Sequence, residues 1–217
     1  GFAIPVAQTF GAKEYSLMRR YVVNASVLAA GISIAIAVVT ALFCRQILIL
    51  IRTPENILDG AYLYLVIIFI GIPFTVLYNL AAGILRSLGD SKSPFLFLVI
   101  STVINVIGDL VCILVFGMGV EGAAISTIVA QAISGICCVL YMKKRFAILK
   151  LERQEEKLSS HRMKILLGMG VPMGLQFSIT AIGTIIVQGA VNIYGSVYMA
   201  GFSAAGKIQN IIATVFV

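Results

Sequence analysis

The chain has 217 residues, of which 60% are hydrophobic and 12% charged, and it carries a formal net charge of +7. Its mean hydropathy of +1.04 excludes an ordinary soluble globular domain and is typical of a membrane protein. The basic residues gather in particular loops between long apolar runs. The positive charge is therefore a membrane-topology signal, and we expect a lipid bilayer as partner and no nucleic acid.

Apolar runs recur along the whole chain and predict an all-α bundle of membrane-spanning helices. Residues 1–10 are expected to end one helix, and the run at 60–85 is expected to be kinked near Gly71-Ile72-Pro73. The chain begins without methionine and ends inside an apolar run, so we expect it to be a piece of a longer protein. The predicted apolar runs are 21–44, 60–85, 94–116, 123–142 and 165–206, the last with a turn at 192–196.

Lysine and arginine residues are divided unevenly between alternate loops. Lys13 and Lys92 fall on the same predicted side as the most polar stretch, residues 143–164, whereas Arg45 and Arg52 fall on the other side. The positive-inside rule then predicts that residues 143–164 form a cytoplasmic linker. We therefore expect an integral, multi-pass membrane protein.

One carboxylate lies inside an apolar run: Asp109, where an ionised side chain costs about 2.5–3.5 kcal/mol. In a hairpin centred on Met118, Asp109 would lie at the depth of Thr127, and Asn105, one helical turn deeper, at the depth of Gln131. Their carboxylate, amide and hydroxyl oxygens would suit a small cation or a proton, with Asn105, Asp109 and Thr127 as the binding residues and Gln131 lining a cavity. The alternative is a structural aspartate held by neighbouring hydroxyl groups and backbone.

A second polar stripe is expected after the linker, where uncharged polar residues recur every four positions and share one broad helical face. Such a face avoids lipid, so it either lines a water-accessible cavity or hydrogen-bonds across a helix interface. Lys207, in the last apolar run, either snorkels to the membrane interface or lines the same cavity. The residues of the stripe are Gln176, Thr180, Thr184 and Gln188.

The sequence contains none of the common enzyme motifs. It lacks Walker and Rossmann glycine patterns, a nucleophile elbow and a His/Cys/carboxylate metal spacing. We therefore expect no enzymatic activity, no cofactor and no metal beyond Na⁺ at Asp109. Polar groups inside spanning helices, in two parts joined by a cytoplasmic linker, instead indicate a secondary transporter.

Four segments of the chain carry a resemblance to a known family by their order and spacing. They are Gln8-Thr9-Phe10-Gly11-Ala12-Lys13, Gly83-Ile84-Leu85-Arg86-Ser87-Leu88-Gly89-Asp90 with Pro94, Gly117-Met118-Gly119-Val120-Glu121-Gly122-Ala123-Ala124, and Gly170-Val171-Pro172. Together they resemble the MATE family, the multidrug and toxic compound extrusion transporters. The resemblance covers the whole chain, from the end of the second helix to part of the eighth in a twelve-helix fold of two six-helix lobes. It implies that residues 1–142 form most of the N-lobe, 143–164 the inter-lobe linker and 165–217 the start of the C-lobe.

The same resemblance implies export of small cationic or aromatic compounds in exchange for Na⁺ or H⁺, in a prokaryotic plasma membrane. The family's N-lobe cation site uses an Asn and an Asp one turn apart on the fifth helix and a Thr on the sixth. These match Asn105, Asp109 and Thr127. Some subfamilies have a Glu on the seventh helix where this chain has Thr180, so we expect the coupling site in the N-lobe.

Two other functions stay open on the sequence. A lipid-linked sugar flippase of related architecture would need a more cationic cavity, for which Lys207 is the one hint. A non-transporting structural or receptor subunit would use the polar stripes only to hold helices together.

Overall fold

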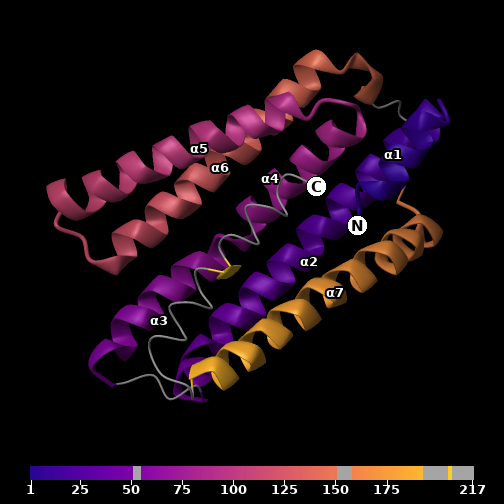
Figure 1. Cartoon of the computed structure of the whole chain (residues 1–217). Helices are drawn as coiled ribbons and strands as arrows, with labels where there is room; N and C mark the ends of the chain where they lie inside the picture. Colours follow the sequence, from indigo (N-terminus) through magenta and orange to yellow (C-terminus); the bar gives the residue numbers. More distant parts are fainter. Residues whose placement is uncertain (51–54, 151–157, 193–204, 207–217) are drawn as a thin grey trace. The chain divides into compact units, whose positions relative to one another are not determined.

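The computed structural model describes residues 1–50, 55–150, 158–192 and 205–206. All regular secondary structure in these residues is helical, which confirms the predicted all-α class (Figure 1). A π-helical turn, Val111–Val115, extends α5, and a short 3₁₀ turn, Ala147–Leu149, follows α6. The helices are α1 (Ile4–Gly11), α2 (Tyr15–Leu50), α3 (Glu55–Ile70), α4 (Ile72–Ser87), α5 (Lys92–Leu110), α6 (Val120–Arg145) and α7 (Ser160–Asn192).

The helices are long and apolar enough to cross a membrane, as the composition predicts. Within the described residues four segments qualify, in α2, in α5 with its π-helical turn, in α6 and in Ser160–Thr184 of α7. The pair α3 and α4 qualifies together as a broken span bent by 41°. The predicted kink is therefore confirmed, and Pro73 in the first turn of α4 explains it, because proline cannot continue a preceding helix without losing a hydrogen bond.

Several helices extend beyond the predicted apolar runs into charged sequence. Arg19 and Arg20, which precede the predicted apolar run 21–44, lie in the first turns of α2, and Lys143, which follows the run 123–142, lies in the last turn of α6. Hydropathy marks the part of a helix that sits in hydrocarbon, whereas lysine and arginine are themselves good helix formers. The expected turn at 192–196 lies outside the described residues except for Asn192, the last residue of α7.

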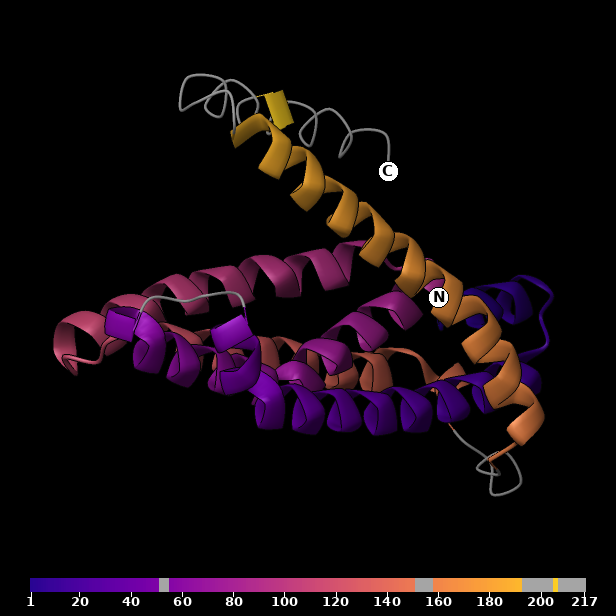
Figure 2. The same ribbon diagram turned by 90° about the horizontal axis from the view of Figure 1, so that it is seen from below.

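The chain divides into two compact units, Phe2–Leu167 and Gly168–Val217 with Gly1. In the larger unit α2 runs the length of the unit, and α4 packs against both α2 and α6 (Figures 1 and 2). α6 also contacts α3 and α5. Small side chains, including Ala81, Ala82 and Ala124, are almost fully buried where these helices meet, as expected for packing inside a membrane.

Hydrogen bonds attach two parts of the polar stretch 143–164 to α2. Arg19 Nη1 donates to the carbonyl oxygen of Ile148 at 3.2 Å. The fully buried Asn24 accepts a hydrogen bond from the backbone N–H of Ser159 at 2.9 Å and donates to the carbonyl of Arg20 at 2.8 Å. Residues on both sides of 151–157 are therefore held against the same helix.

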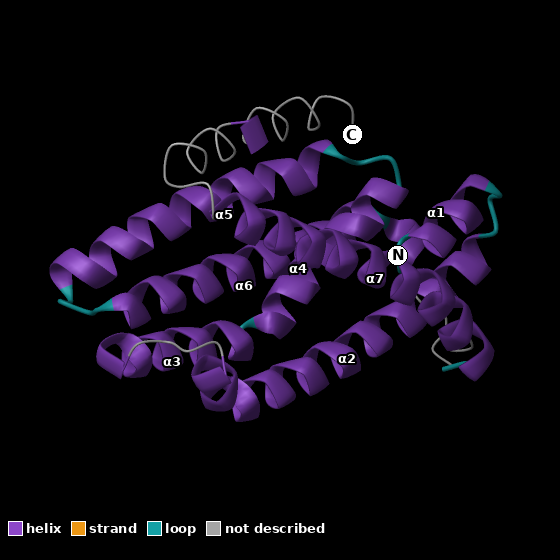
Figure 3. Ribbon diagram, turned by 60° about the horizontal axis from the view of Figure 1, so that its bottom comes forward, coloured by secondary structure: helices purple, strands orange, loops and turns teal. Residues whose placement is uncertain are grey.

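α5 and α6 run side by side as a hairpin (Figure 3). A ladder of serine hydroxyl groups joins them. Ser134 Oγ donates to the carbonyl of Phe97 at 3.2 Å, Ser101 Oγ to that of Ala130 at 2.9 Å, and Ser126 Oγ to that of Asn105 at 2.9 Å. The ladder repeats every four residues on both helices, so its members share one face of each. Each bond satisfies a hydroxyl that would otherwise be exposed to hydrocarbon.

The register of this hairpin differs from the predicted one. The ladder places its centre between Val115 and Phe116, not at Met118. The π-helical turn explains the difference, because its backbone N–H groups bond five residues back, as Phe116 N does to the Val111 carbonyl at 3.1 Å. The π-helical turn uses more residues per turn at the loop end of α5, so each residue of α5 lies nearer to the loop than a regular helix would place it. Asn105 therefore lies opposite residues 126 and 127 and not opposite Gln131.

The two helices approach each other closely at Gly108. A Cβ atom on this residue would collide with Ser126 Oγ. We predict that Gly108→Ala lowers the free energy of unfolding of the full-length protein by about 1–3 kcal/mol, because overpacking forces the helices apart. Thermal denaturation of the purified protein measures this.

The matched control is Gly31→Ala in the middle of α2, where no atom lies within 4 Å of the added Cβ. This change should leave stability unaltered or raise it by up to about 1 kcal/mol through helix propensity. Equal melting temperatures for the two variants would contradict the close approach at Gly108.

Candidate functional site

Four polar side chains meet at the interface of α5 and α6, inside otherwise apolar helices. Asn105 and Asp109 lie one turn apart on α5, and Ser126 and Thr127 are adjacent on α6. Ser126 is buried, and the other three side chains are partly buried. The structure therefore brings together the three residues that the sequence selected, Asn105, Asp109 and Thr127, and adds Ser126.

The amide nitrogen of Asn105 is the centre of this cluster. Its Nδ2 lies 3.3 Å from Asp109 Oδ1, 3.2 Å from Ser126 Oγ and 3.3 Å from Thr127 Oγ1. An amide NH₂ group has two hydrogens, so it cannot make a full hydrogen bond to all three oxygens at once. More acceptor oxygens converge on this point than the amide can satisfy.

Neither hydroxyl group can relieve this excess of acceptors with its own hydrogen. Ser126 Oγ donates to the carbonyl of Asn105, and Thr127 Oγ1 donates to the carbonyl of Ala123, both at 2.9 Å. Their lone pairs are thus what they present to Asn105 Nδ2. Among the described residues, Asn105 is also the one hydrogen-bond donor to the carboxylate of Asp109.

This set of oxygen atoms suits a small hard cation or a proton. One carboxylate and two hydroxyl oxygens are oxygen ligands of the kind that such cations prefer, and one negative charge balances a monovalent ion. A half-turn of the Asn105 amide would exchange its nitrogen for its oxygen and complete an all-oxygen set. A proton would instead bind Asp109 itself and turn the acceptor carboxylate into a donor.

Ser126 was missed by the sequence reasoning, although a signal for it was present. Ser126, Ala130 and Ser134 are small residues spaced by four on α6, and Ser101 has the matching position on α5. Small residues at this spacing predict a close helix–helix contact. That contact sets the register, and the corrected register brings residue 126 to Asn105.

Gln131 does not join the cluster. Its Oε1 atom is buried and has no hydrogen-bond partner among the described residues. The expectation that it lines a cavity stays a prediction.

The polar stripe of α7 belongs to the smaller unit. The side chains of Gln176, Thr180 and Thr184 are exposed, and the two threonine hydroxyls donate to carbonyls four residues back, those of Gln176 and Thr180, each at 2.9 Å. The side chain of Gln188 and all of Lys207 lie outside the described residues. Both interpretations of the stripe, as a cavity wall and as a helix interface, stay predictions.

The loop before α5 carries a carboxylate with a structural role. Asp90 accepts hydrogen bonds from the backbone N–H of Ser93 at 3.0 Å and from its hydroxyl at 2.7 Å. Partial burial raises the pKa of Asp90, but the hydrogen bonds from Ser93, Tyr141 and the Lys92 backbone outweigh it and hold the pKa below its ordinary value. Asp90 therefore fixes the start of the helix that carries Asn105 and Asp109.

Comparison with known proteins places the chain in a family. The family model MatE matches residues 1–111. A "Probable multidrug resistance protein YpnP" of Bacillus subtilis is 34% identical over 211 residues, which are 95% of this chain and 46% of that protein. A "Multidrug export protein MepA" of Staphylococcus haemolyticus is 24% identical over 94% of this chain and 45% of its own length. The chain thus spans about half the length of the curated relatives it matches.

Solved structures show the same fold. "Crystal structure of MATE in the bent conformation" superimposes with a TM-score of 0.87 and 22% identity, over 97% of this chain and 48% of that one. An "Outward-facing conformation of a multidrug resistance MATE family transporter of the MOP superfamily" also gives 0.87, with 21% identity over 97% and 47%. With the family model and the Bacillus subtilis relative, these likenesses show that the chain belongs to the MATE family.

Proposed function

We propose that this chain is part of a transporter that exports small cationic or aromatic compounds from a prokaryotic cell in exchange for Na⁺ or H⁺. The relatives that share its family are named multidrug resistance or multidrug export proteins, which supports the export part. The exchange part depends on the cluster of Asn105, Asp109, Ser126 and Thr127. No catalytic step is involved, since transport makes and breaks no covalent bond.

One observation carries the proposal: three acceptor oxygens converge on a single amide nitrogen within an apolar hairpin. A purely structural aspartate would be expected to have as many donors as it needs, because unsatisfied acceptors in a membrane are costly. An excess of acceptors is instead what a site needs when a cation visits it. In this view Asn105 Nδ2 takes the cation's place when the site is empty.

Binding can drive transport only if the cation prefers one state of the transporter over the other. Na⁺ would leave Asp109 ionised and draw the oxygens of α5 and α6 around it. A proton would neutralise Asp109 and so weaken the hydrogen bond that its carboxylate accepts from Asn105 Nδ2. Both changes act beside the close contact of Gly108 with Ser126, so small movements there would be passed to the two helices.

The arrangement in the membrane follows from the same proposal. Residues 1–142 would form most of the N-lobe, 143–164 a cytoplasmic linker and 165–217 the start of the C-lobe. Thr180 carries no charge, which favours coupling through Asp109 in the N-lobe. The flippase alternative depended on Lys207, which lies outside the described residues.

We predict that Asp109→Asn abolishes efflux driven by an ion gradient while the full-length protein is still made and inserted, because the amide cannot be ionised or balance a cation. The measurement is efflux of a fluorescent cationic dye from vesicles under an imposed Na⁺ or pH gradient. Binding of ²²Na⁺, or pH-dependent dye binding, should be lost in parallel.

Asp59→Asn is the matched control, since Asp59 is an exposed carboxylate of α3 outside the cluster. This variant should transport normally. Normal gradient-driven efflux by Asp109→Asn would refute the coupling role, and equal loss in both variants would mean that the effect is not specific to the cluster.

Replacing Thr127 tests the hydroxyl ligand separately. Thr127→Val keeps the shape of the side chain but removes one oxygen, so the apparent affinity for the coupling ion should fall about tenfold. Thr102→Val is the control, because the Thr102 hydroxyl is exposed and donates to the carbonyl of Leu98 on its own helix. The concentration of Na⁺ or H⁺ that gives half-maximal efflux measures both, and unchanged affinity in Thr127→Val would contradict its role as a ligand.

A further inference from the structure

A second feature of the larger unit lies away from the polar cluster, where α2 faces α4 and α6. Two cavities, of about 250 Å³ and about 700 Å³, open side by side along α2. They share part of their walls, so together they form one continuous groove. The shared lining residues are Ser26, Leu77, Val139 and Met142.

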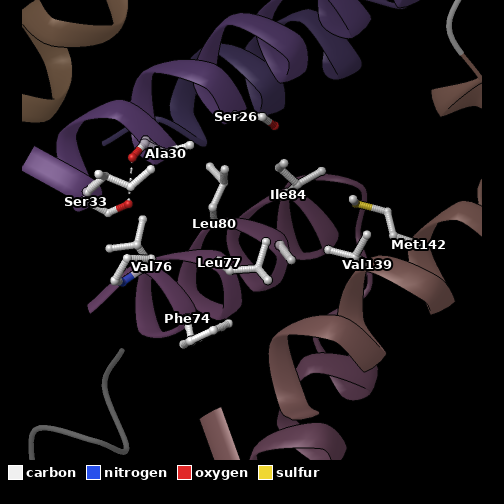
Figure 4. Close-up of a pocket in the computed structure, with 14 residues that line it drawn as sticks. Ser26, Ala30, Ser33, Phe74, Val76, Leu77, Leu80, Ile84, Val139 and Met142 are labelled. Carbon is white, nitrogen blue, oxygen red and sulfur yellow. Dashed lines mark hydrogen bonds between the residues drawn. The ribbon is translucent and has the colours of Figure 1, made fainter. Parts of the chain in front are cut away.

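The inner part of the groove is apolar. Figure 4 shows side chains of α2 facing those of α4 and α6 across it, with Leu77, Leu80 and Ile84 on one side and Val139 and Met142 beside them. The hydroxyl of Ser33 is turned back to the carbonyl of Ala30 at 2.9 Å. This wall offers apolar contacts and almost no hydrogen-bonding groups to an occupant.

The outer end of the groove is cationic. Arg19, Lys143 and Lys150 line it together with apolar residues such as Phe146. No acidic side chain is found among the described residues that line either cavity. The hydrogen bond from Arg19 Nη1 to the Ile148 carbonyl holds the guanidinium at this end.

The length of the groove matches one leaflet of a membrane. Along α2 its uncharged lining runs from Val22 to Ile34, about 18 Å at the helical rise per residue, and Arg19 lines the groove about one turn further out. The hydrocarbon of one leaflet is about 15 Å thick, half of the bilayer core.

We propose that this groove binds one anionic phospholipid, with an acyl chain between α2, α4 and α6 and the phosphate headgroup at Arg19, Lys143 and Lys150. The apolar wall selects a lipid over a soluble anion, and the basic end selects an anionic headgroup over a zwitterionic one. Basic pockets between membrane helices on the cytoplasmic side bind such headgroups in general. The groove is separate from the polar cluster. The proposal of a bound lipid therefore does not depend on whether the transporter is coupled at Asp109.

The test uses the full-length protein in vesicles with a phosphatidylglycerol that carries a photoreactive diazirine on its acyl chain. Phosphatidylcholine with the same chain is the comparison, and labelled peptides are mapped by mass spectrometry. The groove predicts labelling concentrated in residues 22–34 of α2 and 77–84 of α4, at least about fivefold stronger with phosphatidylglycerol.

The triple variant Arg19→Gln, Lys143→Gln, Lys150→Gln should lower this labelling at least about tenfold, because each basic side chain near an anionic surface contributes about fivefold. A matched triple, Lys13→Gln, Lys92→Gln, Lys164→Gln, removes the same charge from exposed positions that line neither cavity and should label like the unaltered protein. Ser26→Phe fills the groove while it keeps all three charges, and it should also lose the labelling.

Three outcomes would overturn the proposal. Equal labelling by the two lipids would show that the headgroup is not recognised. Absence of labelling in the groove of the unaltered protein would show that another segment covers it. Equal loss in both triple variants would show a general effect of charge at the membrane surface.

Discussion

Hydrocarbon offers no hydrogen bonds, and this constraint decides how α5 and α6 are built. Every polar group between them must find its partner inside the protein. Ser101, Ser126 and Ser134 do so in the simplest way, each donating its hydroxyl hydrogen to a carbonyl of the opposite helix. These bonds fix the register of the hairpin, and the register determines which side chains meet beside Asp109.

The polar cluster contrasts with this ladder. In the ladder each hydroxyl has one acceptor, whereas at Asn105 three acceptor oxygens share one amide group. The same pair of helices thus contains matched polar groups, which hold it together, and an unmatched group, on which the proposed cation site depends. The ladder and the cluster overlap at Ser126, which belongs to both. Thr127, the next residue, belongs to the cluster alone.

The sequence predicted much of this arrangement because burial in a membrane leaves a strong signal. The spans, the kink at Pro73 and the meeting of Asn105, Asp109 and Thr127 followed from runs of apolar residues and from polar residues spaced by four. The bounds of α2 and α6 did not follow, because a helix continues through Arg19 or Lys143 after it has left the hydrocarbon. The hairpin register did not follow either, since a π-helical turn at Val111–Val115 has no pattern in an unbroken run of apolar residues.

The lipid groove could not be predicted from the sequence for a similar reason. Leu77, Val139 and Met142 look like ordinary core residues, and only their packing leaves a space beside α2. The central claim concerns the cation cluster, and infrared difference spectroscopy of the full-length protein, labelled with ¹³C-aspartate, tests it directly. The account predicts a band that is absent from Asp109→Asn and that shifts as an ionised carboxylate on adding Na⁺, or becomes a protonated carboxyl on lowering the pH. An Asp109 band that responds to neither ion would contradict it.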